Sequence, residues 1–236
     1  MTQTETQDQD QGTAAFQRAR RPEQREQRRE AILDAAGALL REMPASEVSL
    51  RELSRRVGLS KSNVVRYFET REAVFLELLD RSIGEWLDAL EDELPPVPGP
   101  DGPPVASGAL ARAWAGSLAR RPLLCELWSI LAAVLERNVS VESVRAFKLR
   151  EADHRARLAR MAGDRLPGLD EPAAMELTRI SVVLTAGLWP FANPSAAVVE
   201  ATGDPCLAEA RVNFGESLGT MLHAALKGLL CGHATP

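Results

Sequence analysis

Apolar residues recur at three- and four-residue spacing along most of the chain, which is the period of amphipathic α-helices. Ala, Leu, Arg and Glu, which are strong helix formers, make up much of these stretches. Aromatic residues form only 5% of the 236-residue sequence. The pattern therefore predicts an all-α fold of about nine helices.

The first predicted helices follow one another closely. Apolar side chains repeat at helical spacing over residues 23–42, and Pro44 ends the pattern. Ser49 stands three residues before Glu52, a spacing typical of a capping box at the start of a helix. We expect this second helix to end at Gly58, because glycine tolerates the left-handed conformation of a tight turn.

Capping residues and helix breakers place the remaining elements. Ser60 and Thr70 are expected to cap a third and a fourth helix. Five further helices are predicted at residues 106–119, 122–137, 141–162, 171–189 and 205–230, with Ser140, Asp170 and Asp204 as N-caps of the last three. The chain then divides into a disordered tail (1–22), a helical domain (23–94), a Pro- and Gly-rich loop (95–104) and a second helical domain (105–236).

Two short helices joined at Gly58 match a helix-turn-helix pattern. Val64 and Phe68 would face inward, leaving small and polar side chains outside, where a helix can enter a DNA major groove about 12 Å wide. An ordinary helical hairpin on the surface would show the same periodicity. The residues predicted to contact DNA are Ser49, Ser60, Lys61, Ser62, Asn63, Val65, Arg66, Tyr67 and, at the start of the fourth helix, Arg71.

The distribution of charge favours a polyanion as partner of this region. Residues 16–76 hold 13 Lys and Arg against nine Asp and Glu, a net charge of +4, so the total of −5 leaves −9 on the rest of the chain. A basic segment on an acidic remainder is typical of a nucleic-acid-binding domain, although a solvated helical surface can also carry such charges.

Residues from about 27 to 80 resemble the DNA-binding domain of TetR-family transcriptional repressors, through "ILDAAGALL" and "SLRELSRRVGLSKSNVVRYFETREAVF". The residues that match the family pattern are Gly58, Ser60, Lys61, Tyr67, Phe68 and Glu72, with Arg71 in place of a lysine. The resemblance implies that Lys61, Tyr67 and Arg71 contact the DNA backbone. Val65 stands where the family usually has an aromatic residue, and it is expected to touch a thymine methyl instead.

The resemblance also implies that residues 105–236 form a ligand-binding and dimerisation domain. Pockets for small molecules are mostly apolar. The candidates for pocket residues, each of which could instead fill the core, are Trp114, Trp128, Trp189 and Phe191. A stripe on the last predicted helix suits a homodimer seam, or burial within one subunit, and contains Leu207, Phe214, Leu218, Met221 and Leu222.

Several classes of function lack support in the sequence. There is no Walker loop, Rossmann glycine pattern, H-E-x-x-H or G-x-S-x-G motif, so we expect no catalytic residues, no metal site and no cofactor. Cys125, Cys206 and Cys231 have no metal-site spacing and are expected to be buried thiols in a cytoplasmic protein, with redox sensing as the alternative. No apolar run is long enough to suggest a membrane span.

The sequence therefore predicts a ligand-responsive repressor that binds palindromic operator DNA as a homodimer and is released by a small apolar or aromatic effector. One alternative is a DNA-binding regulator whose C-terminal domain docks a protein partner. Another is a helical enzyme or carrier that contains the same hairpin.

Overall fold

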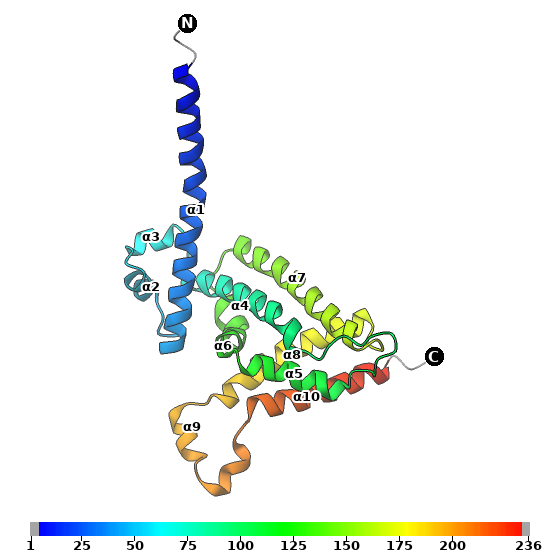
Figure 1. The fold of residues 1–236 in the computed structure, drawn as a ribbon. Helices are drawn as coiled ribbons and strands as arrows, with labels where there is room; N and C mark the ends of the chain where they lie inside the picture. Colours follow the sequence, from blue (N-terminus) through cyan, green and yellow to red (C-terminus); the bar gives the residue numbers. More distant parts are fainter. Residues whose placement is uncertain (1–4, 233–236) are drawn as a thin grey trace. The chain divides into compact units, whose positions relative to one another are not determined.

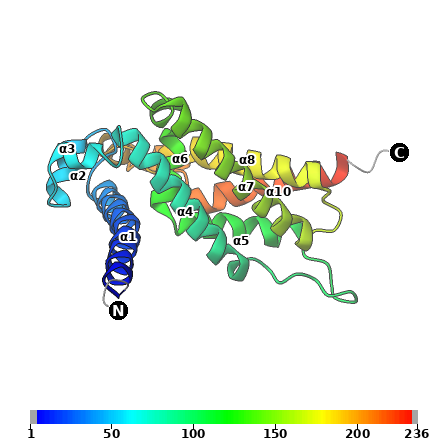
Figure 2. The ribbon, with the colours of Figure 1, turned by 90° about the horizontal axis from the view of Figure 1, so that it is seen from above.

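The computed structural model describes the backbone of residues 5–232 and the side chains of residues 23–232. All regular structure in the described part of the chain is helical, which confirms the predicted fold class (Figures 1 and 2). The chain separates into two compact units, Met1–Val74 and Phe75–Pro236.

The first unit consists of α1 (Glu5–Glu42), α2 (Leu50–Arg56), α3 (Lys61–Val65) and the first turn of α4 (Arg71–Glu93). The predicted caps are confirmed: the side-chain oxygens of Ser49, Ser60 and Thr70 accept hydrogen bonds from the backbone N–H groups of the third residue on, at 3.1, 3.2 and 3.1 Å. Its buried core includes Ile32, Leu39, Val48, Leu53, Val64 and Phe68. Apart from Val48, which lies in the loop before α2, these are apolar positions of the helical pattern.

The first helix is longer than its apolar pattern predicts. The helical backbone of α1 begins at Glu5, so it runs through most of the segment expected to be a disordered tail. Gln, Ala and Arg are frequent in that segment and favour extension of an existing helix, because propagation adds one hydrogen bond per residue fixed, whereas Pro22 removes one such bond.

The second unit contains the rest of α4 and the following elements: α5 (Ser107–Ala119), α6 (Pro122–Ile130), the π-helix η1 (Leu131–Leu135), α7 (Val141–Arg165), α8 (Glu171–Ala192), α9 (Ala196–Ala201), the 3-10 helix η2 (Pro205–Ala210) and α10 (Phe214–Gly232). Helix α10 packs closely along α5, where Gly219 lies against Ala115 and Gly215 against Ala119. Helix α8 packs on α6, α7 and α10.

Two predicted helices are divided in the structure. The helix expected over 122–137 changes to a π-helix at Leu131, where Glu136 N–H bonds to Leu131 C=O at 3.2 Å. The helix expected over 205–230 breaks between η2 and α10, because Asn213 caps a separate helix by accepting the Glu216 N–H at 3.2 Å. An Asn three residues before a Glu was the sequence signal for this second start.

A tryptophan cluster fills the middle of the second unit. Trp86 of α4 makes edge contacts with Trp114 of α5 and Trp128 of α6, with ring centroids 6.2 and 5.6 Å apart. The indole N–H of Trp86 donates to Ser117 Oγ at 2.9 Å. Aromatic pairs in this geometry stabilise a core beyond their buried area.

The cysteines differ from the prediction. Cys125 is buried, and this burial raises the pKa of its thiol to about 12, but Cys206 and Cys231 are exposed. Within residues 5–232 no helix has the length and apolar character needed to cross a membrane. Residues 23–232, whose side chains are described, hold no cluster of His, Cys, Asp and Glu suited to a metal ion.

Candidate nucleic-acid interface

The turn between α2 and α3 depends on Gly58. Its φ is +67°, in the left-handed region, and it is the one described residue with a positive φ. The turn is closed by Leu59 N–H, which donates to Ser54 C=O at 3.0 Å. Buried Leu53 and Val64 hold the two short helices together, so the hairpin has a fixed inner face.

The outer face of α3 carries most of the predicted DNA-binding residues. Lys61, Ser62, Asn63 and Arg66 are exposed, Val65 is 42% exposed, and Tyr67 is half-buried. Ser49 and Ser60 are also exposed, and their oxygens cap α2 and α3. The structure therefore brings the α3 candidates together on one solvent-facing surface.

Arg71 has a structural role that the sequence did not reveal. Its Nη1 atom donates to the carbonyl oxygens of Ser46 and Val48 at 3.1 and 3.0 Å, and its Nε atom lies 2.8 Å from Glu72 Oε1. The Glu72 side chain is only 6% exposed. Arg71 thus ties the loop before α2 to the start of α4, and a phosphate contact through this residue stays a prediction.

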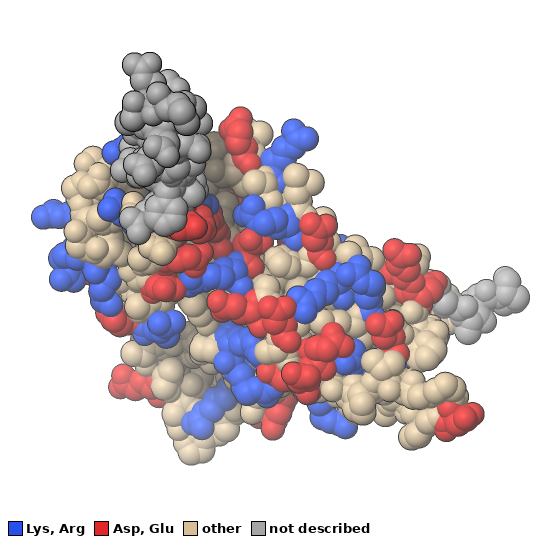
Figure 3. Space-filling view, turned by 45° about the horizontal axis from the view of Figure 1, so that its top comes forward, with Lys and Arg blue, Asp and Glu red and all other residues tan. Residues whose placement is uncertain are grey.

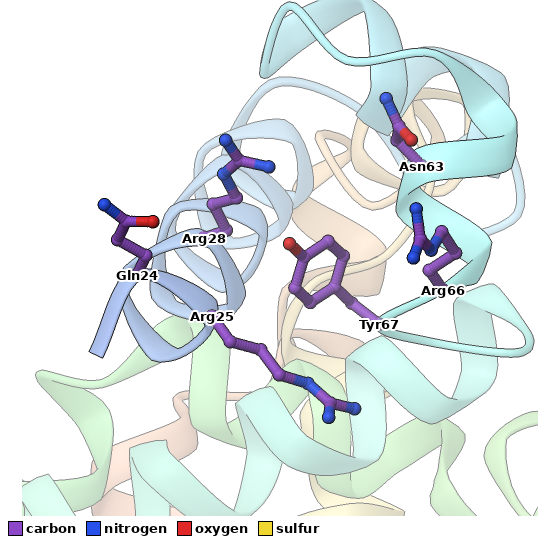
Figure 4. A pocket seen from close by; sticks show the side chains of 6 residues that line it. All are labelled: Gln24, Arg25, Arg28, Asn63, Arg66 and Tyr67. Carbon is purple, nitrogen blue, oxygen red and sulfur yellow. The ribbon is translucent and has the colours of Figure 1, made fainter. Parts of the chain in front are cut away.

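A basic hollow of about 390 Å³ opens between α1 and the end of α3 (Figure 4). Its lining side chains are all polar or cationic: Gln24, Arg25, Arg28, Asn63, Arg66 and Tyr67. In Figure 4 the Tyr67 hydroxyl points toward α1. The α1 residues were absent from the predicted contacts, although Arg25 and Arg28 stand one helical turn apart.

Two other arginines of the first unit are held by neighbouring side chains. Arg29, one residue beyond Arg28, has its guanidinium 4.8 Å from the centre of the Phe68 ring, and Arg56 donates to Glu42 at 3.0 Å. In Figure 3 several Lys and Arg side chains gather at the left edge, where α2 and α3 lie in Figure 1, whereas acidic and basic groups mix elsewhere on the visible face. The exposed cations on this surface suit a polyanionic ligand.

The predicted ligand-binding residues separate into buried and exposed ones. Trp114, Trp128 and Trp189 are 1, 5 and 8% exposed, and Trp189 N–H donates to Glu126 at 2.9 Å. The buried indole N–H of Trp114 has no hydrogen-bond partner within the described residues. Phe191 is 71% exposed near the end of α8, so it lies outside the interior of the single chain, and its role in a pocket stays a prediction.

The predicted dimer stripe is mostly internal. Phe214, Leu218 and Leu222 are 8, 0 and 1% exposed in the single chain, because this face of α10 packs into its own unit. Because these side chains already pack within their own unit, they leave little surface for a partner, and their place in a dimer interface stays a prediction. Met221 and Leu207 remain 43 and 47% exposed, but Leu207 lies in η2 and not on α10.

The fold and this surface define a class: an all-helical protein with an N-terminal helix-turn-helix, of the kind found in transcriptional regulators. Residues 32–78 match the family described as bacterial regulatory proteins, tetR family, and residues 80–233 match the tetracyclin repressor-like C-terminal domain. The chain therefore belongs to the TetR family of transcriptional regulators, as the resemblance implied. This family consists of regulators, which agrees with the expectation of a non-enzyme.

Curated relatives match a short part of the chain. The HTH-type transcriptional regulator EthR of Mycobacterium tuberculosis is 38% identical over 55 residues, 23% of this chain, and an EthR from Mycobacterium bovis matches equally. The match spans only 26% of the length of EthR.

Solved structures share the fold over nearly the whole chain. A tetR-family regulator from Streptomyces coelicolor aligns with a TM-score of 0.55 at 17% identity, covering 88% of this chain and 83% of that one. The multidrug binding protein EbrR, crystallised with imidazole, aligns with a TM-score of 0.54 at 18% identity, covering 84% and 94%. At this identity the likeness concerns the fold alone.

Proposed function

We propose that this protein is a dimeric repressor that binds an inverted-repeat operator in the cytoplasm and leaves it when a small apolar or aromatic molecule binds the second unit. The observation that carries the proposal is the exposed outer face of α3, held on a capped helix-turn-helix in a TetR-family chain. Membership of the TetR family supports both the proposed binding of operator DNA and the proposed response to an effector.

Helix α3 is the proposed reading element. Asn63 and Ser62 are exposed near its start, where side chains of a recognition helix reach base edges, and Val65 offers an apolar contact to a thymine methyl. Lys61, Arg66 and Tyr67 are proposed to contact phosphates, with the Ser49 and Ser60 hydroxyls at the edges of the surface. Phosphate contacts position a protein on DNA, whereas base contacts give it specificity.

Helices α8 and α10 are the proposed dimer interface. These helices pack on each other, and each leaves a large apolar side chain in solvent: Val183 of α8 is 62% exposed and Met221 of α10 is 43% exposed. Phe191, which is 71% exposed, extends the apolar surface of α8. A second copy could bury these side chains in a symmetric four-helix contact.

The tryptophan cluster is the proposed effector site. Buried polar groups are nearly always hydrogen-bonded, so the unpartnered N–H of Trp114 favours a ligand that brings an acceptor. Trp86 and Trp128 offer aromatic faces in the same cluster. EbrR is a multidrug binding protein whose structure contains imidazole, and we extend the binding of a small molecule to this chain by fold analogy.

The proposed release of operator DNA by an effector can be tested through thermodynamic reciprocity. Genomic fragments bound by the protein are selected, and compounds are then screened for quenching of tryptophan fluorescence. A true effector lowers the affinity of the protein for operator DNA, and operator DNA must lower the affinity for the effector by the same factor. A typical factor is about 5–150. A compound that binds free and operator-saturated protein equally well would favour the alternative in which the second unit docks a protein.

A further inference from the structure

The basic hollow between α1 and α3 brings two cations of α1, which the proposed α3 contacts do not include, beside Arg66, which they do. Arg25 and Arg28 come from α1, and Arg66 follows α3. None of the three forms an ion pair or hydrogen bond with another residue whose side chain is described. Among the residues whose side chains are described, no acidic one lines the hollow.

Three guanidinium groups around one hollow repel one another unless an anion lies between them. In the same unit Arg55 pairs with Glu52 and Arg56 with Glu42. The three arginines of the hollow have no such carboxylate partner among the residues whose side chains are described. A guanidinium offers several N–H donors in one plane, which matches the oxygens of a phosphate group.

The hollow is continuous with the proposed reading surface. Asn63 and Tyr67 belong to both, and the Tyr67 hydroxyl points toward α1 in Figure 4. A DNA strand held by α3 would place its backbone phosphates beside Tyr67. The amide of Gln24 adds a neutral donor on the α1 side.

On this geometry we infer that Arg25 and Arg28 of α1, with Arg66 and Tyr67, form a second phosphate-binding site for the operator backbone. This inference rests on the proposed DNA binding. Helix α1 thereby acts as a second DNA-contacting element, which binds the DNA backbone beside the recognition helix α3. Its contribution is to affinity and register, and not to sequence preference.

The test compares wild type with Arg25→Ala/Arg28→Ala by fluorescence anisotropy on selected operator DNA and on random DNA, from about 50 to 200 mM salt. Alanine keeps the helix propensity of α1, and thermal unfolding checks that the fold is intact. Arg25→Lys/Arg28→Lys keeps the charge. Arg41→Ala removes an exposed arginine in the last turn of the same helix, outside the hollow.

The dimer should lose two to four phosphate contacts in the alanine variant, which lowers the log–log salt slope by about 2–4. Affinity for operator and random DNA should fall by similar factors, while the Lys variant and Arg41→Ala keep slopes close to wild type. If the alanine variant keeps the DNA affinity and the salt slope of the wild type, the inference is overturned. This holds even if calorimetry shows that the hollow binds inorganic pyrophosphate. Failure of wild type to bind any DNA would instead reject the proposed function.

Discussion

At the scale of single residues, Arg71 and Arg66 are expected to have different roles: Arg71 stabilises the fold and Arg66 binds DNA. Arg71 donates to two carbonyl oxygens and pairs with the buried Glu72, whereas Arg66 is exposed. Arg71→Ala should lower the free energy of unfolding by about 1–3 kcal/mol, because it removes the partner of the buried Glu72 carboxylate and of the loop carbonyls. Arg66→Ala should leave stability unchanged and weaken DNA binding.

Urea unfolding of the free protein measures the first effect and anisotropy titration the second. If Arg71→Ala unfolds at the same urea concentration as wild type, the hydrogen bonds of its guanidinium do not stabilise the first unit.

Asp80 provides a pH-dependent test of the second unit. Burial raises the pKa of Asp80, but its contact with His154 at 3.1 Å and its ion pair with Arg150 at 2.6 Å outweigh burial and lower the pKa below its ordinary value. A carboxylate with a lowered pKa stabilises the fold at neutral pH, and this contribution is lost as the pH falls through the folded-state pKa. Asp80→Asn should therefore cost about 1–3 kcal/mol at pH 7.

Asp88 is the matched control, since it also joins α4 to α7, through Arg157 at 2.6 Å, but is 73% exposed. Asp88→Asn should cost at most about 1 kcal/mol, as exposed ion pairs usually do. Denaturant unfolding at a series of pH values should show the gap between wild type and Asp80→Asn shrinking below pH about 4. A gap that stays constant down to pH about 2 would show that it does not depend on the charge of Asp80.

At the scale of elements, the turn before α3 depends on the left-handed backbone of Gly58. A Cβ at this position meets no atom within 4 Å, so the cost of a side chain is conformational. Gly58→Ala should lower stability by about 1–2 kcal/mol, and Gly58→Asn by less, because Asn tolerates this region better. Equal stability of all three proteins in thermal unfolding would show that the turn adopts another conformation.

How far the sequence predicts these elements depends on whether the signal is local. Ser49, Ser60 and Asp170 cap helices where predicted, because a cap needs only its own residue and the N–H groups that follow. The π-helix at Leu131 has no such local signal.

For the candidate site, too, the sequence predicts only the features that have a local signal. The outward direction of α3 follows from the apolar spacing of Val64 and Phe68, which are both buried. The hollow was not predictable in this way, because Arg25 and Tyr67 come together only when α1 packs in the first unit. The sequence signal for a basic face of this helix was the spacing of Arg18 and Arg21, which precede Arg25 by seven and four residues.

At the scale of the whole molecule, the proposed dimer depends on exposed apolar residues of α8 and α10. Val183→Asp introduces a charge that a buried interface cannot accommodate, so light scattering should show a monomer and DNA affinity should fall. Val141→Asp is the control, since Val141 is 78% exposed on α7, away from the proposed interface. A dimeric Val183→Asp protein would contradict the assignment of α8.

The central claim, that this chain is a dimeric regulator whose helix-turn-helix binds operator DNA, is tested most directly by selecting bound genomic fragments and titrating them by anisotropy at several salt concentrations. We expect an enriched inverted repeat bound by two or more chains, with affinity falling about 10³–10⁵-fold between 50 and 200 mM salt if 6–10 phosphates are contacted. Absence of an enriched sequence, or an affinity that does not change with salt, would contradict it.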